Sequence, residues 1–193
     1  HAIIRIDLAG GALTRLQGHP KLKGRVTSFH SLRLCSGRLF AVSWDYVYSW
    51  GKRGGYVGRH KLGFEAAHIV RNEKDQLVAI GHEGEMCLLT PDFEVVASAK
   101  IDALDAVADA KIVGDELYVS GMTKRNTWGL WQCDQRSGKT MHTFPTRDPM
   151  SGFHSAKADV LYAINNRTNK MVKWVFDKEW KAAHELSGTA QKI

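Results

Sequence analysis

The stretch "RLFAVSWDYVYSWG", residues 38–51, decides the fold. Residues 39–44 would be close to apolar on both faces of an extended chain, which is typical of a strand with neighbours on each side. Similar segments, "QLVAIG", "ELYVSG" and "VLYAIN", follow along the chain. Their leucines are Leu39, Leu77, Leu117 and Leu161, at steps of 38, 40 and 44 residues. The chain is therefore built from a repeated unit.

A repeat of about 40 residues made of short strands is typical of a β-propeller blade. We therefore predict an all-β propeller with four complete four-stranded blades at approximately 25–62, 66–101, 106–144 and 151–187. Residues 1–19 match only the two outer strands of a blade. An open propeller leaves unpaired strand edges. We therefore expect the single domain or fragment, 1–193, to belong to a larger propeller or assembly, with further blades from another segment or chain.

The stretch "IDALDAVADA", residues 101–110, does not read clearly as a strand. Ile101, Leu104 and Ala108 are spaced as on one face of a helix. A short helix in a connection between blades is therefore an alternative here.

The chain carries a formal net charge of +7 and has a sequence pI of about 9.4. Such a surplus favours contact with nucleic acid, an anionic membrane or an acidic protein. The basic residues are scattered, without a block of five like charges, which is equally typical of an ordinary soluble surface. No run approaches the roughly 18 apolar residues of a membrane span, so we expect a soluble chain without a membrane partner.

The three cysteines, Cys35, Cys87 and Cys133, lie far apart and form no C-x-x-C pair. This pattern favours reduced, buried thiols over a disulfide framework or a zinc site. We therefore expect a cytoplasmic or organelle-matrix location, although the glycosylation triplet 166–168 points the other way. We expect no cofactor and no metal.

A Gly-His pair ending at His19 precedes the first complete blade, which then contains Ser43, Asp45 and Trp50. In this combination the blade resembles the WD-repeat family of propellers. The resemblance implies a structural hydrogen-bonded relay of His19, Ser43, Asp45 and Trp50, in which buried polar groups satisfy one another. Asp45 and Trp50 are one residue closer than in that family, and later blades keep less of the pattern. A propeller of another lineage stays open.

The candidate partner contacts lie in turns and connections, which in the WD-repeat arrangement share one face. Aromatic residues flank one turn, and aromatics are favoured interface anchors; basic residues in the other loops would suit phosphates or carboxylates. The candidates are Trp44, Tyr46, Lys21, Lys23, Lys124, Arg125 and Arg167. The opposite face would also be basic, through Lys52, Arg53, Arg136 and Lys139. We expect protein partners, with an acidic peptide or RNA as an alternative.

An enzymatic alternative rests on polar residues near the starts of the innermost strands, one from each complete blade. These are His30, His68, Asp109 and His154, which in a propeller could converge on a central channel and bind a metal. The sequence contains no H-E-x-x-H, G-x-S-x-G, phosphate loop or dinucleotide fingerprint. We therefore predict a non-catalytic scaffold for macromolecular interactions, inside a larger protein or complex, with a propeller enzyme as the alternative.

Overall fold

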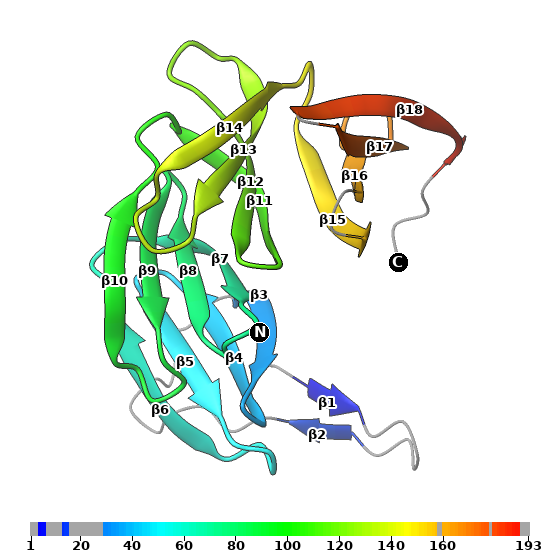
Figure 1. Ribbon diagram of the computed structural model, residues 1–193. Coiled ribbons are helices and arrows are strands. Elements are labelled where there is room, and N and C mark those ends of the chain that lie inside the picture. The colour runs from blue at the N-terminus through cyan, green and yellow to red at the C-terminus, as the bar shows by residue number, and fades with distance from the viewer. Residues whose placement is uncertain (1–3, 7–12, 16–28, 158–159, 178, 190–193) are drawn as a thin grey trace. The chain divides into compact units, whose positions relative to one another are not determined.

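The structure is a computed structural model that describes residues 4–6, 13–15, 29–157, 160–177 and 179–189 (Figure 1). Throughout these residues the chain forms β-strands joined by turns, and they contain no helix. In this part of the chain, accordingly, nothing helical could cross a membrane.

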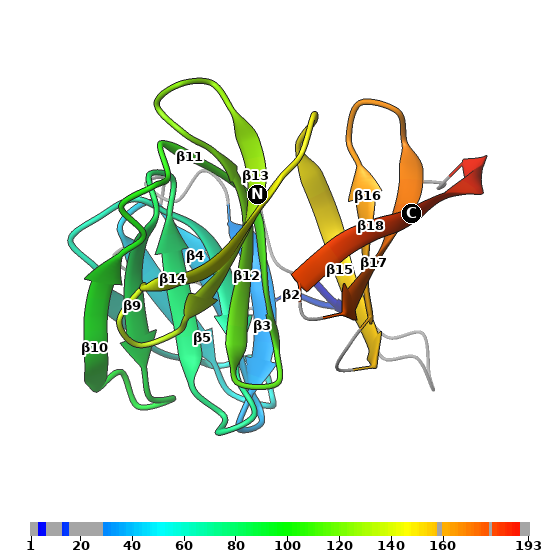
Figure 2. The same ribbon diagram turned by 45° about the horizontal axis from the view of Figure 1, so that its top comes forward.

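The strands form four antiparallel sheets, each of four strands in chain order (Figures 1 and 2). Blade 1 consists of β3 (His30–Cys35), β4 (Arg38–Ser43), β5 (Tyr46–Trp50) and β6 (Tyr56–Lys61). Blade 2 consists of β7 (Ala66–Arg71), β8 (Leu77–Gly81), β9 (Glu85–Leu89) and β10 (Val95–Lys100). Blade 3 consists of β11 (Ala106–Val113), β12 (Glu116–Met122), β13 (Trp128–Asp134) and β14 (Thr140–Pro145). Blade 4 consists of β15 (Met150–Lys157), β16 (Val160–Asn165), β17 (Lys170–Asp177) and β18 (Glu179–Thr189).

A short two-stranded sheet precedes the blades. It pairs β1 (Ile4–Ile6) with β2 (Leu13–Arg15) in antiparallel register. Four-stranded meanders that follow one another along the chain are the blades of a β-propeller. The predicted fold, four complete blades and an N-terminal half-blade, is confirmed.

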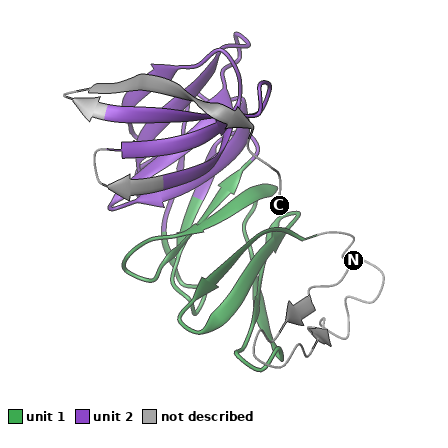
Figure 3. Cartoon of the chain, turned by 90° about the vertical axis from the view of Figure 1, so that its right-hand side faces the viewer, with its two compact units in different colours: residues 1–81, 87–96 green, residues 82–86, 97–193 purple. Residues whose placement is uncertain are grey.

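The chain divides into two compact units (Figure 3). Unit 1 contains residues 1–81 and 87–96, and unit 2 contains residues 82–86 and 97–193. The boundary passes through the outer part of blade 2, so that blade 1 lies wholly in unit 1 and blades 3 and 4 lie wholly in unit 2.

In unit 1, blades 1 and 2 bury a shared hydrophobic cluster. Its strands are apolar on the facing sides, which is why the leucine segments of the sequence recur. The cluster contains Cys35, Phe40, Val42, Val47, Ala66, Ile69, Leu77, Ala79, Cys87 and Leu89. Every residue of β8 is buried, as expected for a strand covered on both faces.

In unit 2, blades 3 and 4 bury a second cluster. It contains Tyr118, Leu130, Phe144, Met150, Phe153, Leu161, Ala163, Val172 and Trp174. On β16 buried and half-buried residues alternate, whereas β12 is buried on both faces. The two faces of blade 4 therefore differ in burial.

The helical alternative for residues 101–110 is wrong. A backbone hydrogen bond from Leu104 N to Ile101 O, at 3.1 Å, closes a tight turn, and β11 begins at Ala106. Ile101 and Leu104 are buried because this turn packs on Gly84, where an added Cβ would come within 3.0 Å of the Ile101 carbonyl oxygen. The three-residue spacing reflects this turn rather than a helix.

Candidate functional site

An exposed tryptophan stands at the tip of blade 1. Trp44 and Asp45 form the two-residue turn between β4 and β5, and the Trp44 side chain keeps 58% of its surface exposed. The Trp44 φ is 54°, in the left-handed region, at a position where two-residue hairpin turns favour glycine or asparagine. A bulky residue in this conformation indicates local strain.

The following chain holds this turn in place. The Trp44 carbonyl accepts a hydrogen bond from Ala66 N at 2.8 Å, and the Asp45 carbonyl accepts one from Leu62 N at 2.7 Å. Leu62 directly follows β6 and Ala66 begins β7, so the connection to blade 2 fixes the turn from outside the hairpin. A strained residue persists only where its surroundings over-determine it. These two bonds supply that constraint for Trp44.

Behind the turn lies a row of aromatic rings on β5. The Tyr46 and Tyr48 ring centroids are 5.9 Å apart, and those of Tyr48 and Trp50 are 6.2 Å apart. Phe29 meets Tyr48 and Trp50 edge-on at 5.5 and 5.3 Å. Tyr48 and Trp50 are buried, at 3% and 2% exposure, so these two rings support the sheet.

Two basic side chains cover the outer part of this row. Arg59 and Lys61 of β6 lie opposite Tyr48 and Tyr46 in the pairing register. The Arg59 guanidinium sits over the Tyr46 ring, 4.4 Å from its centroid, and its hydrogen bond with Tyr48 raises the Arg59 pKa. Lys61 Nζ lies 3.6 Å from Asp45 Oδ2. We call Trp44, Tyr46, Arg59 and Lys61 the blade 1 surface.

Blade 1 is more basic than blade 2. Residues 29–62 contain six arginines and lysines and a single acidic residue, Asp45. Residues 63–100 contain three basic and seven acidic residues. The basic residues form no block of five like charges, but the balance of charge differs between these two blades. Basic residues gather on blade 1, and acidic residues on blade 2.

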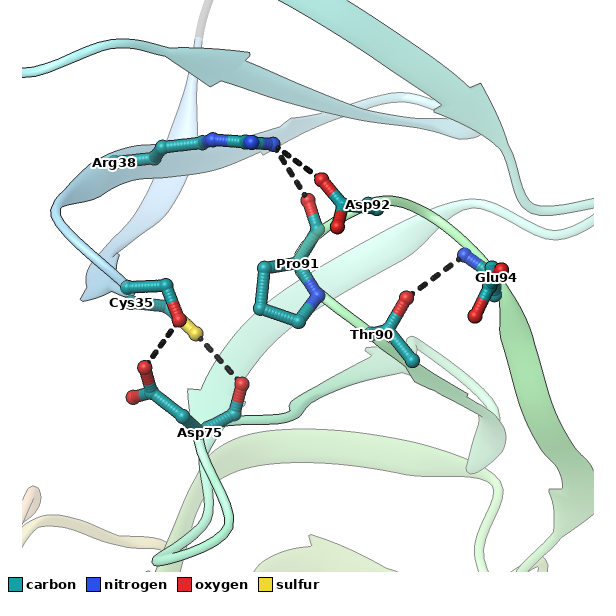
Figure 4. A network of polar contacts seen from close by, with 8 residues as sticks. Cys35, Arg38, Asp75, Thr90, Pro91, Asp92 and Glu94 are labelled. Carbon is teal, nitrogen blue, oxygen red and sulfur yellow. Dashed lines mark hydrogen bonds and ion pairs between the residues drawn. The ribbon is translucent and has the colours of Figure 1, made fainter.

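Complementary charge joins blades 1 and 2 (Figure 4). Arg38 Nη1 donates to Asp92 Oδ1 at 2.9 Å and to the Pro91 carbonyl at 3.2 Å. In the same network Ser36 Oγ donates to an Asp75 carboxylate oxygen, and Cys35 Sγ donates to the Asp75 carbonyl at 3.0 Å. The Ser36 bond lowers the pKa of Asp75. These hydrogen bonds hold the β3–β4 turn against blade 2.

The three cysteines are buried, and none forms a disulfide. Burial raises the pKa of the Cys35 thiol to about 11, with a further contribution from the Asp75 charge, and burial likewise raises that of Cys133 to about 11. Thiols that stay protonated at neutral pH are poor nucleophiles and poor metal ligands. This agrees with a structural role in the core.

The proposed relay falls partly outside the described residues, because His19 lies there. Ser43 is buried and pairs with Tyr46 at one end of the β4–β5 hairpin, while Trp50 pairs with Leu39 at the other. The ring of Tyr48 lies on β5 between these ends, next to the Tyr46 and Trp50 rings. Asp45 contacts Lys61. The relay stays a prediction.

The candidate contact residues in loops are distributed over separate elements. Lys21 and Lys23 lie outside the described residues. Lys124 and Arg125 are exposed on the β12–β13 turn, and Arg167, also exposed, forms an ion pair with Asp148 at 3.4 Å. Trp44 and Tyr46 lie together with Arg59 and Lys61. Of the predicted contacts, only these two aromatics join a described cluster of aromatic and basic side chains on one blade.

Each of the four channel candidates lies on the first strand of a blade. Each lies next to a register shift in its strand: His30 on β3, His68 on β7, Asp109 on β11 and His154 on β15. His30 and His68 belong to unit 1, and the other two to unit 2. Their convergence on one channel therefore stays a prediction.

Within unit 2 Asp109 has a structural contact. Its Oδ2 accepts a hydrogen bond from Gly152 N at 2.6 Å, which joins β11 to β15. Across the described part of the chain, no three His, Cys, Asp or Glu side chains are grouped so that they could hold a metal ion.

Sequence reasoning missed Arg59 and Lys61 as members of the site. No local motif marks them, because their role comes from lying opposite β5 aromatics. Two signals could have found them: the count of charges per blade, and the alternation of half-buried and exposed residues along β6.

The comparisons with known proteins identify the fold. No protein-family model matches the sequence, and no curated protein is a detectable relative. Among solved structures, the chain is similar to the WD40 domain of Toxoplasma gondii coronin, with 14% identity and a TM-score of 0.67, over 90% of this chain and 48% of that one. It is similar to U3-55K, with 13% identity and a TM-score of 0.64, over 85% and 52% of the two chains.

A third similar structure is that of an enzyme. Catalytically inactive virginiamycin B lyase from Staphylococcus aureus, crystallised with quinupristin, has 13% identity and a TM-score of 0.73, over 94% of this chain and 62% of that one. The chain thus spans about half the length of the coronin and U3-55K chains. At these identities the likeness establishes the propeller fold and nothing further about activity.

Proposed function

We propose that this chain is a non-catalytic propeller scaffold that binds a partner protein through the blade 1 surface. The observation that carries the proposal is Trp44: a large aromatic side chain, 58% exposed, held in a left-handed backbone conformation at the tip of a hairpin. Stability alone would favour glycine or asparagine there. A tryptophan that is both strained and exposed is better explained by contact with a partner protein than by a contribution to stability.

Tryptophan and arginine are the residues that most often dominate the energy of a protein interface. On blade 1 Trp44 lies on a turn fixed by two backbone hydrogen bonds, and Arg59 is held by Tyr46 and Tyr48. Side chains ordered before binding lose less entropy when a partner docks. The site therefore has the properties of a preformed contact surface.

The likeness to WD40 domains supports the proposal of a scaffold, because those chains share the blade architecture of this chain. Catalysis in a central channel is the alternative, and it would require the four innermost-strand residues to converge. RNA binding is the other alternative, and it would draw on Lys124 and Arg125 as well as on blade 1. Neither alternative accounts for the strained turn at Trp44.

The test compares the proteins that co-purify with the wild type and with two variants. Trp44→Gly removes the anchor and suits the left-handed backbone, so the variant keeps its fold. Quantitative co-purification from the source cells should give at least one protein that is depleted about tenfold with Trp44→Gly and retained with Lys124→Gln. Equal capture by wild type and Trp44→Gly would contradict the proposal.

A further inference from the structure

Strand β6 ends the blade 1 sheet. The strand order is β3-β4-β5-β6, so within the described residues one side of β6 pairs with β5 and no strand follows it on the other. Its residues alternate between half-buried and exposed. An edge strand of this kind offers backbone N–H and C=O groups to another extended segment.

The exposed positions of β6 are Val57, Arg59 and Lys61, which alternate along the strand. Basic side chains on an edge oppose pairing with another basic or apolar strand. The same side chains favour an acidic strand, because opposite charges facing each other across a ladder attract. Residues two apart on any strand are roughly 6.6 Å apart, so alternating carboxylates on a partner strand would match Arg59 and Lys61.

Blade 1 has little acidic charge of its own to neutralise these residues. Asp45 is its single carboxylate, and that group lies at Lys61. The described contacts of Arg59 are the Tyr46 ring and the Tyr48 hydroxyl, both of which leave its charge uncompensated. The guanidinium is fixed in place and lacks a carboxylate partner in the described part of the chain.

The aromatic rings argue against single-stranded nucleic acid as the occupant. Such a strand is bound by stacking bases on exposed aromatic faces along a basic groove. Here Arg59 covers Tyr46, and Tyr48 and Trp50 are buried. Only Trp44 keeps a largely exposed ring, which is too few for a stacking platform.

The chain contains its own example of an acidic segment on a blade 1 arginine. Arg38 binds the Asp92 carboxylate and the adjoining Pro91 carbonyl of blade 2, a side-chain and a backbone acceptor together (Figure 4). Blade 2 is the acidic blade of the pair. An acidic segment docking on Arg59 would make the same kind of contact on the outer strand.

We infer that the blade 1 surface binds an extended acidic segment of a partner protein, which adds to the edge of β6 with alternate carboxylates facing Arg59 and Lys61. This rests on the proposed function and specifies its partner. Trp44, at the turn next to Lys61's partner Asp45, supplies the apolar end of the site.

The experiment measures binding of synthetic probes to the intact protein by fluorescence anisotropy. The probe is a labelled peptide of alternating glutamate and threonine, with an alternating lysine–threonine peptide and oligothymidylate as comparisons. The double variant Arg59→Gln/Lys61→Gln should weaken binding of the glutamate peptide about tenfold, and added salt should weaken it further. The matched control, Lys124→Gln/Arg125→Gln, removes the same charge from the β12–β13 turn and should leave binding within about twofold.

Hydrogen exchange adds a structural readout. The glutamate peptide should slow amide exchange within residues 56–61 and leave 123–127 unchanged. The inference is overturned if the glutamate peptide does not bind, if both double variants lose binding equally, or if oligothymidylate binds more tightly than the peptide. Should the peptide fail while Trp44→Gly still depletes a co-purifying protein, only the acidic partner is refuted, and the proposed function stands.

Discussion

Replacing Trp44 by glycine and by alanine separates backbone strain from side-chain contact. Both variants delete the indole, so they lose the same contacts, and they differ only in how well the residue tolerates a φ of 54°. Holding a residue with a Cβ in the left-handed region costs about 1–2 kcal/mol. Glycine avoids that cost but loses about 0.4–1 kcal/mol through the greater freedom of its unfolded chain.

The balance makes Trp44→Gly more stable than Trp44→Ala by about 0.5–1 kcal/mol. Urea unfolding followed by circular dichroism, with the slope held common to both variants, measures the difference directly. The reasoning is refuted if alanine equals or exceeds glycine in stability, because the turn would then not be strained.

Lys124 provides the matched control for this pair. It is also exposed in a turn between the second and third strands of a blade, and its φ is not in the left-handed region. There alanine should be more stable than glycine by about 0.4–1 kcal/mol, the opposite order. A reversal between the two sites assigns the effect to backbone conformation at Trp44.

Three further outcomes follow from other parts of the fold. Gly121→Ala should destabilise the protein by about 1–3 kcal/mol in urea unfolding, because the new Cβ would press on the Ala106 carbonyl and lie 2.7 Å from Leu104 Cδ2, whereas Gly55→Ala has no atom within 4 Å of its Cβ and should cost less. Asp109→Ala should cost about 0.5–1.5 kcal/mol by removing the hydrogen bond that Gly152 N donates, and an equal loss in Asp109→Asn would contradict a hydrogen-bonding role. Because burial raises the pKa of the Cys133 thiol from 9.0 to about 11, the unfolded chain loses that proton first; stability should be full below about pH 9 and fall toward pH 11, and Cys133→Ala should reduce the fall.

The blades were predictable because their second strands are buried on both faces. A strand such as β8 must then be a short continuous apolar run, and such runs recur at the length of a blade. Turn chemistry supported the same boundaries. Gly84, for example, adopts a φ of 86°, which only glycine tolerates readily, between β8 and β9.

The site was predictable only in part. Trp44 was found from its place beside a turn, but its left-handed backbone depends on hydrogen bonds from Ala66 and Leu62, which are distant in sequence. Arg59 was missed because its position over Tyr46 follows from strand register, which the residues of β6 do not reveal by themselves. The spacing of Ile101 and Leu104 suggested a helix, but a single tight turn also brings together residues three apart in the sequence.

The central claim is that partners dock on the blade 1 surface. The most direct measurement is hydrogen–deuterium exchange of the protein alone and in complex with a protein that Trp44→Gly fails to capture. The account predicts slower exchange in residues 44–46 and 56–61, with 123–127 and 166–169 unchanged. Protection confined to the first strands of the blades, β3, β7, β11 and β15, or to the β12–β13 turn, would contradict it.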